Sequence, residues 1–169
     1  HAAQLKTEFL RSLMAGSLAR ELSGQTREGE EMFLGALFQN LGRLLTEFYF
    51  PEEAQQVRRQ VRDAQGTQAP VSEATASARA LGITYEELGV AVAKRWGLPE
   101  GLTSVMRRPP GEPPARAIDK PVDRQRWLAR LANEAADVIL TTEPDKTAAK
   151  LRQLGERPPK ALTRGPDPA

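Results

Sequence analysis

The stretch FLGALFQNLGRLLTEFYFPEEA, residues 33–54, decides the fold class that this sequence predicts. Apolar side chains cover almost every side of a helix drawn over its first part, as expected of a helix in the centre of a bundle. Pro51 interrupts that helix and can open the next one, whose first turn then holds Glu52 and Glu53 at the positive helix end. We therefore predict a buried helix from about Arg27 to Tyr49 and a polar surface helix from Pro51.

Helical spacing continues on both sides of this stretch. Upstream, we predict a helix from Gln4 to Leu22, ended by Gly24, with a core stripe of Leu5, Phe9, Leu13, Leu18 and Leu22. Downstream, capping residues, glycines and prolines indicate helices over residues 72–81, 84–96, 99–107, 122–140 and 144–154. In the helix over 122–140 we expect these residues to face inward: Trp127, Leu128, Leu131, Ala135, Val138 and Ile139.

No segment alternates apolar and polar residues as a strand would, so the predicted fold class is all-α, a bundle of about six to eight helices. Residues 108–121 hold five prolines and are expected to form a long loop. We assign residues 1–155 to one helical domain and residues 156–169 to a Pro-rich tail that is extended or disordered. Trp96, near a helix end, is interpreted as a core anchor.

The composition is that of an ordinary globular protein. The 169 residues are 40% hydrophobic and 27% charged with a net charge of +2, and the basic residues are interspersed with acidic ones and form no stripe. There is no apolar run of the roughly 18 residues that a membrane span needs. Cysteine is absent, which excludes disulfides and thiolate metal sites. We expect a cytoplasmic domain with neither a membrane nor a nucleic acid as its partner.

Three segments together resemble a known family. Residues 33–54 resemble the HD-superfamily helix, in which an apolar run is followed by His-Asp, an apolar residue, Gly and Lys. Two further segments, ARALGITYEELGVAVAKRWGLPEGLTSVM (78–106) and WLARLANEAADVI (127–139), are similar to later motifs of the HD-related output domain (HDOD) family, a degenerate branch of that superfamily. The resemblance implies an HD-like helical bundle. It also implies further helices upstream, so we expect the chain to be the C-terminal portion of such a domain.

The resemblance also implies which residues stand at the metal-ligand positions of HD phosphohydrolases. Gln39 and Asn40 replace the His-Asp pair, Asn133 replaces the distant Asp, and Arg11 falls near the upstream His. Further histidines of some HD phosphodiesterases would fall at Tyr85 and at Arg107 or Arg108. Neutral amides and arginines are poor ligands for a dication, and the one histidine is His1. We therefore expect no catalysis, no metal and no cofactor.

Two interpretations of this vestigial site stay open. Gly35, Gln39, Gly42 and Thr46 share one helix face, so the amides can fill the former metal site as buried hydrogen-bonding groups, with Asn40 bonded to Asn133. Alternatively, the site is a ligand pocket. The candidate residues for that pocket are Arg11, Gln39, Asn40, Asn133, Tyr85 and Arg107.

Three functions follow from these interpretations. The resemblance favours a non-catalytic output module of bacterial signal transduction. Such a module acts by protein–protein contact, and its partners are receiver, kinase or cyclic-di-GMP domains, or a second copy of the chain. The polar helix from Pro51 and the loop over 108–121 are the expected contact surfaces. The alternatives are a metal-free sensor of a nucleotide or cyclic dinucleotide, and a metal-dependent phosphohydrolase, for which the ligands are missing.

Overall fold

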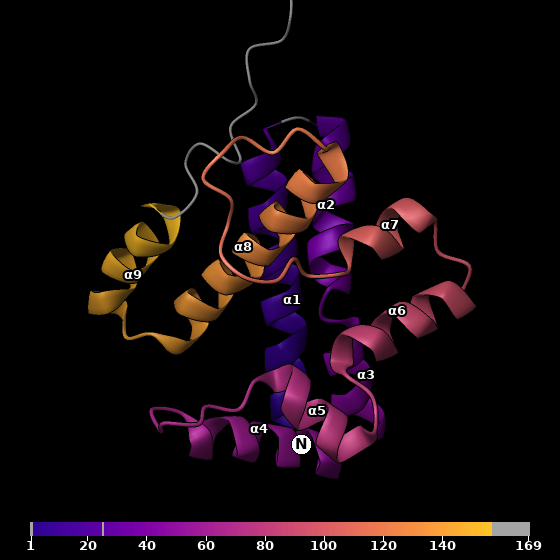
Figure 1. Ribbon diagram of the computed structural model, residues 1–169, viewed down its shortest axis with the longest axis vertical. Coiled ribbons are helices and arrows are strands. Elements are labelled where there is room, and N and C mark those ends of the chain that lie inside the picture. Colours follow the sequence, from indigo (N-terminus) through magenta and orange to yellow (C-terminus); the bar gives the residue numbers. More distant parts are fainter. Residues whose placement is uncertain (1, 25, 157–169) are drawn as a thin grey trace, which may run out of the picture.

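The computed structural model describes residues 2–24 and 26–156, and within them it contains nine helices and no strand (Figure 1). Their bounds are α1 Ala2–Ser23, α2 Thr26–Phe38, α3 Leu41–Tyr49, α4 Pro51–Ala64, α5 Glu73–Leu81, α6 Tyr85–Arg95, α7 Glu100–Val105, α8 Pro121–Thr141 and α9 Pro144–Glu156. The predicted all-α class is confirmed. The tail predicted over residues 156–169 lies outside the described residues except for Glu156, which ends α9.

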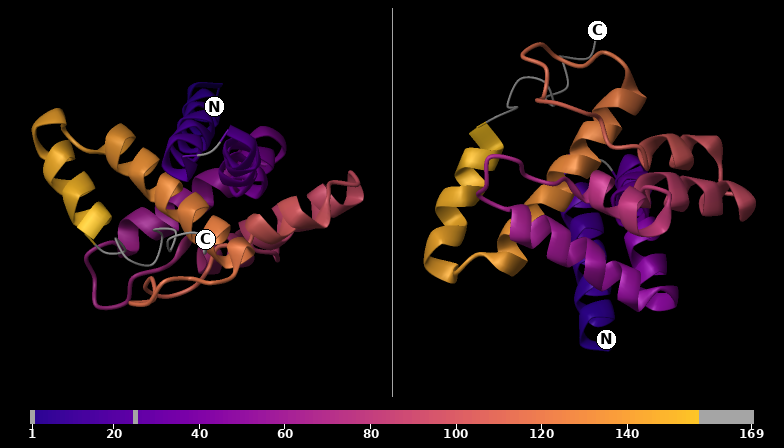
Figure 2. Two further views of the ribbon diagram at one scale, coloured as in Figure 1. Left: turned by 90° about the horizontal axis from the view of Figure 1, so that it is seen from above. Right: turned by 60° about the horizontal axis from the view of Figure 1, so that its bottom comes forward.

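The helices α1, α2 and α8 form the main body, and α1 contacts both of the others (Figure 1). On one side of this body α9 packs on α8, and on the opposite side lie α6 and α7 (Figures 1 and 2). Helices α4 and α5 pack on each other across the end of the molecule where α1 begins. The pair α3 and α6 connects this end to the main body.

Three clusters of buried apolar side chains hold these elements together. The largest joins α1, α2, α7 and α8 and is rich in alanine: Ala15, Ala19, Met32, Ala36, Val105, Leu128, Ala129, Ala132 and Ala136. A second cluster joins α3 and α6 through Leu41, Val90, Ala93 and Met106, and a third joins α4, α5 and α6 through Val57, Ala76 and Tyr85. Because small side chains dominate the largest cluster, the axes of its helices can approach closely.

The single helix predicted from Arg27 to Tyr49 is wrong, because the chain turns at Gln39 and Asn40. In a regular helix the Asn40 N–H would bond the Ala36 carbonyl. It bonds the Leu37 carbonyl instead, at 3.1 Å, while the Ala36 carbonyl accepts side-chain N–H groups of Asn40 (3.3 Å) and Asn133 (3.1 Å). Side-chain amides thus take the acceptor that would have continued the helix. This break raises the number of helices above the expected six to eight.

The expected core stripes also need correction. In α1 the buried residues are Glu8, Ser12, Ala15, Gly16 and Ala19, while Phe9 and Leu22 are exposed. Gly16 lies against Phe33 of α2 so closely that an added Cβ would be 2.9 Å from that ring. Contact with α2 therefore selects the small residues of α1 for full burial, while Leu5, Leu13 and Leu18 of the expected stripe are only partly buried.

Three further expectations about burial are only partly met or are wrong. Of the residues expected to face inward from α8, Leu128 alone is fully buried, and the helix buries Ala129, Ala132, Asn133 and Ala136 beside it. Phe48 and Tyr49, at the end of the helix predicted to be buried all round, are 58% and 64% exposed. Trp96 is exposed and is no core anchor.

The boundaries that were predicted from capping residues are confirmed. The Ser72 hydroxyl accepts the Thr75 N–H and the Thr84 hydroxyl accepts the Glu87 N–H, both at 3.1 Å, so α5 and α6 begin where expected. Gly82 and Gly97 end the same helices with positive φ angles of 76°. Residues 108–120 contain no helix, as their prolines predicted, and none of the described helices is long and apolar enough to cross a membrane.

Candidate functional site

The turn between α2 and α3 carries a buried network of three side-chain amides. Asn40 Nδ2 donates to Asn133 Oδ1 at 2.5 Å, and Asn133 Nδ2 lies 3.2 Å from Gln39 Oε1. Gln39 Nε2 in turn donates to the Val105 carbonyl at 2.9 Å. Asn40 and Asn133 are 2% and 3% exposed. The bond expected between Asn40 and Asn133 is therefore present, and it ties the turn to α8.

A pocket of about 310 Å³ opens in front of this network. Its lining comes from the α2–α3 turn, the N-terminal ends of α5 and α6, and the residues after α7: Gln39, Asn40, Arg43, Glu73, Ala74, Thr84, Tyr85, Glu86, Glu87, Met106, Arg107 and Arg108. The structure thus brings together four of the six predicted site residues, namely Gln39, Asn40, Tyr85 and Arg107. Asn133 does not line the pocket but supports Asn40.

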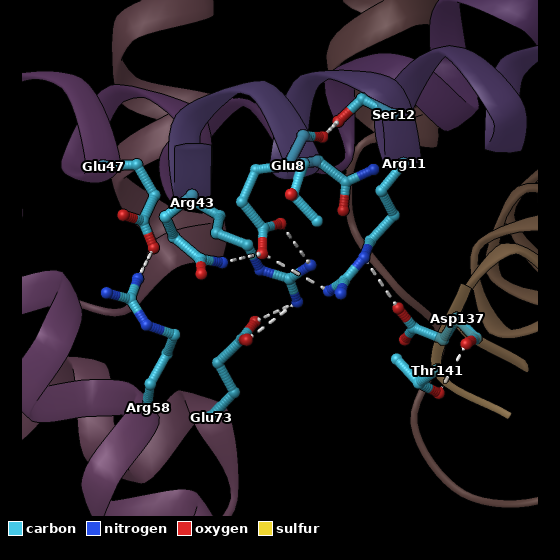
Figure 3. A network of polar contacts seen from close by, with 12 residues as sticks. Glu8, Arg11, Ser12, Arg43, Glu47, Arg58, Glu73, Asp137 and Thr141 are labelled. Carbon is cyan, nitrogen blue, oxygen red and sulfur yellow. Dashed lines mark hydrogen bonds and ion pairs between the residues drawn. The ribbon is translucent and has the colours of Figure 1, made fainter. Parts of the chain in front are cut away.

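Arg11, the remaining predicted residue, does not line the pocket either. Its Nε lies 3.1 Å from an Asp137 carboxylate oxygen of α8, and its Nη1 lies 3.5 Å from Glu8 Oε1 (Figure 3). Arg11 therefore links α1 to α8 and lies outside the lining of this pocket. The resemblance that placed Arg11 near an HD ligand position gives no information about Asp137, which reaches it from α8.

Arg43 was missed by the sequence analysis, although it follows Gly42 where the HD motif has its Lys. Its Nη2 lies 2.7 Å from both carboxylate oxygens of Glu73, and its Nη1 lies 3.4 Å from Glu8 Oε2 (Figure 3). Burial alone would lower the pKa of Arg43, but the charges of Glu73 and Glu8 outweigh it and raise that pKa above its ordinary value. Arg43 is thus a cation whose charge is already balanced by protein carboxylates.

Arg108, and not Arg107, faces the amide network. Its Nη2 donates to Asn40 Oδ1 at 3.3 Å. Burial is the main reason that the pKa of Arg108 is lowered, and the positive charge of Arg43 adds to it. The carboxylates of Glu73, Asp137 and Glu134 act in the opposite direction without offsetting these two effects. The positive charge of the Arg108 guanidinium is therefore not balanced by the surrounding carboxylates.

The loop that carries Arg108 is held in place by two arginines of α8. Arg126 Nε donates to the Arg107 carbonyl at 2.7 Å. Arg130 Nη1 reaches the carbonyls of Pro109 (2.7 Å) and Gly111 (2.6 Å). Prolines lack N–H groups and cannot form the backbone hydrogen bonds that would otherwise hold this loop. The bonds from the α8 guanidiniums to the loop carbonyls hold it instead, and they thereby place Arg108 at the pocket.

Tyr85 forms the opposite wall at the start of α6. Its backbone N–H donates to the Ser77 hydroxyl at 3.2 Å, and its carbonyl touches Gly42 so closely that a Cβ there would overlap it. Burial, assisted by the charge of Glu73, raises the pKa of the Tyr85 phenol to about 12. The phenol therefore keeps its proton at neutral pH and can act as a hydrogen-bond donor.

The donor set at the HD position does not fit a catalytic dication. Gln39, Asn40 and Asn133 offer dipoles without negative charge, and the Arg108 guanidinium contacts one of them. Within the described residues, no three His, Asp or Glu side chains are grouped so that they could hold a metal ion.

The fold and the site together define the class of this protein: an all-helical domain with an amide-filled turn and a polar pocket beside it. The family model of the HDOD domain matches residues 1–109. The chain therefore belongs to the HDOD family. The matched range ends before α8, so the resemblance noted for residues 127–139 lies beyond it. A search of curated proteins and a search of solved structures each found no match.

Proposed function

We propose that this chain is a non-catalytic output domain of bacterial signal transduction that acts through protein–protein contact. One observation carries the proposal: at the HD position, the bond between Asn40 and Asn133 occupies two side chains that would have to be anionic or imidazole ligands for metal-dependent hydrolysis. The contact of Arg108 with Asn40 adds a positive charge at the same place. A domain that lacks the chemistry of its superfamily acts through its surfaces.

The contact surface that we propose is the corner between α3 and α4. Three consecutive aromatic side chains, Phe48, Tyr49 and Phe50, are all about half exposed or more at this corner. Aromatic residues are enriched at the centre of protein interfaces, where they contribute most of the binding energy. The polar face of α4, which was expected to be a contact surface, continues directly from them. Receiver, kinase or cyclic-di-GMP domains are the proposed partners.

Hydrolysis assays test the absence of catalysis. The purified chain is incubated with a phosphomonoester and a phosphodiester, with Mg²⁺, Mn²⁺ or no added metal, and release of the leaving group is measured. We expect no turnover above the protein-free rate. Turnover that disappears in the Asn40→Ala variant would refute the proposal.

The contact surface is tested in cells. A deletion strain is complemented with the wild-type gene, with a Phe48→Ser/Tyr49→Ser variant, or with a Leu22→Ser control that changes an equally exposed apolar residue of α1. We expect the double variant, once shown by circular dichroism to be folded, to leave the strain's transcript profile uncorrected while the control corrects it. Full correction by the double variant would exclude this surface.

A second candidate function is a metal-free sensor of a nucleotide or cyclic dinucleotide. The observation that favours it is the pocket of about 310 Å³, which side chains leave open and to which Arg43, Arg107 and Arg108 contribute. A metal-dependent phosphohydrolase would require ligands that Gln39, Asn40 and Asn133 do not supply.

A further inference from the structure

Arg108 differs from the other partly buried arginines of the described chain in its charge balance. Arg43, Arg124 and Arg11 each lie within ion-pair distance of a carboxylate: Arg43 of Glu73, Arg124 of Glu28 and Arg11 of Asp137. Among the ion pairs of residues 2–24 and 26–156, none includes Arg108. Its one side-chain partner there is the neutral amide of Asn40. Arg108 is partly buried, so without a counter-ion its guanidinium has lost part of the water that would solvate its charge.

The surroundings of Arg108 add positive potential and neutral donors. The helices α5 and α6 both begin at the pocket, at Glu73–Ala74 and Thr84–Glu87, so the positive ends of two helix dipoles lie at its wall. Tyr85, whose phenol keeps its proton at neutral pH, lines the same wall, and Arg107 adds a cation.

Three carboxylates also line the pocket, and they do not cancel the charge of Arg108. Both oxygens of Glu73 are engaged by Arg43. Glu86 and Glu87 stand in the first turn of α6, where carboxylates are stabilised by the helix dipole, and neither forms an ion pair with Arg108. Arg108 therefore stands at the pocket without a carboxylate of the described residues within ion-pair distance.

We propose that this pocket binds a small oxyanion, a phosphoryl or carboxylate group of a soluble ligand, with the Arg108 guanidinium as its counter-ion. Guanidinium groups present paired N–H donors that match both kinds of oxyanion. The inference rests on the proposal that the site is non-catalytic, because without a metal a protein cation has to neutralise the ligand. A volume of about 310 Å³ lies at the small end of ligand pockets. It suits a ligand of about the size of a mononucleotide.

Titration calorimetry tests this inference with three probes: inorganic phosphate, a nucleoside monophosphate and succinate. We expect at least one probe to bind the wild-type chain, and Arg108→Gln to weaken that binding by about tenfold or more. Arg95→Gln, which removes an exposed arginine at the far end of α6, should change the affinity by less than about twofold. Preference for the first two probes identifies a phosphoryl ligand, and preference for succinate identifies a carboxylate.

The Arg108→Gln variant is expected to fold, because it removes a charge that burial disfavours while keeping a donor for Asn40. Its melting temperature without ligand should equal or exceed that of the wild type. In the wild type, the bound probe should shift the nuclear magnetic resonance signals of the Asn40 side-chain amide and the Arg108 Nε–H group. No binding of any probe, or equal binding by wild type and Arg108→Gln, overturns the inference.

Failure of this inference and failure of the proposed function give different results. If the nucleoside monophosphate is bound and slowly hydrolysed when Mn²⁺ is added, the proposal of a non-catalytic domain is refuted. If no probe binds and no hydrolysis occurs, the oxyanion site is refuted and the non-catalytic domain stands.

Discussion

The side chains of Asn40 and Asn133 form the closest polar contact between the α2–α3 turn and α8. Each amide forms further hydrogen bonds. Asn40 also donates to the Ala36 carbonyl, and Asn133 also donates to the carbonyls of Ala36 and Ala129. Both side chains are buried, so an amide that loses its partner is left without water to replace it. The amide network therefore contributes to the stability of the fold, although it lies at the position of the HD metal ligands.

Removing one amide should cost more than removing a surface hydrogen bond. We expect Asn133→Ala to lower the free energy of unfolding by about 2–3 kcal/mol, because it leaves Gln39 Oε1 without a partner and Asn40 Nδ2 with only its 3.3 Å bond to the Ala36 carbonyl. In a double-mutant cycle, Asn40→Ala and Asn133→Ala should be coupled by about 1 kcal/mol or more. Urea denaturation measures both quantities.

The control pair for this cycle is Asn133→Ala with Ser72→Ala, which removes the cap of α5. These losses should add. Additive losses for Asn40 and Asn133 themselves would contradict the proposed network.

Tyr85 provides a pH-dependent prediction. Its pKa is about 12 in the folded chain and near 10 when unfolded, so the folded state disfavours the phenolate. The corresponding stability is present below pH 10 and is lost as the pH rises to about 12. We expect the wild type to lose about 1–2 kcal/mol more than Tyr85→Phe between these values, after allowance for solvent screening. Chemical denaturation at pH 9 and pH 11.5 measures the difference, and parallel losses would contradict it.

At the scale of residues, the site was only partly predictable. Gln39, Asn40 and Tyr85 were placed correctly by their positions in the motifs, because local sequence decides which residue occupies a motif position. The direction of the Arg108 side chain could not be predicted, since it depends on the bonds from Arg126 and Arg130 to the loop carbonyls. Contacts between residues so far apart in the sequence leave no local pattern.

At the scale of elements, the crossing of α3 and α6 depends on two glycines. The backbone of Gly42 touches the Tyr85 carbonyl, and a Cβ on Gly89 would be 2.9 Å from the Gly42 nitrogen. The two helices therefore pack backbone against backbone at this point. The same contact positions both the α2–α3 turn and the start of α6, which are two walls of the pocket.

A side chain at this crossing should separate the two helices. We expect Gly42→Ala to lower the free energy of unfolding by about 3 kcal/mol or more, since the clash is with backbone atoms. Gly101→Ala is the matched control: this residue of α7 has open space around the added Cβ, and alanine there should raise stability by up to about 1 kcal/mol. Thermal unfolding measures the stability of both variants. Equal effects of Gly42→Ala and Gly101→Ala would contradict the proposed backbone contact.

The elements themselves were more predictable than their faces. Ser72 and Thr84 act on backbone groups three residues away, so the starts of α5 and α6 follow from local sequence. The buried face of α1 does not, because it is selected by the contact of Gly16 with Phe33. The break at Asn40 was missed for the same reason: it requires Asn133 to reach the Ala36 carbonyl from α8.

At the scale of the whole molecule, the helices differ in how firmly they are attached. The helices α1, α2 and α8 share the largest buried cluster. Helix α9 contributes no residue to the three clusters and packs on α8 alone among the close helix pairs of the described chain. Local opening should therefore occur at α9 at a lower free energy than in the main body.

Hydrogen exchange followed by mass spectrometry tests this difference. We expect the amides of α9 to exchange at least about tenfold faster than those of α1 and α8, and a chain ending at Thr142 to keep the helicity of α1–α8. The amides of α6 serve as the internal control for a helix that belongs to a buried cluster. Protection of α9 equal to that of α1 would show that it belongs to the main cooperative unit.

The contact between Arg108 and Asn40 has a consequence for protein engineering. An attempt to rebuild a metalloenzyme from this scaffold would begin with Asn40→Asp and Asn133→Asp, to restore negative ligands. With a guanidinium 3.3 Å from the Asn40 side chain, the first new carboxylate would form an ion pair with Arg108 before any metal could use it. A redesign would therefore have to replace Arg108 first, since this arginine would compete with the metal ion for the new carboxylate.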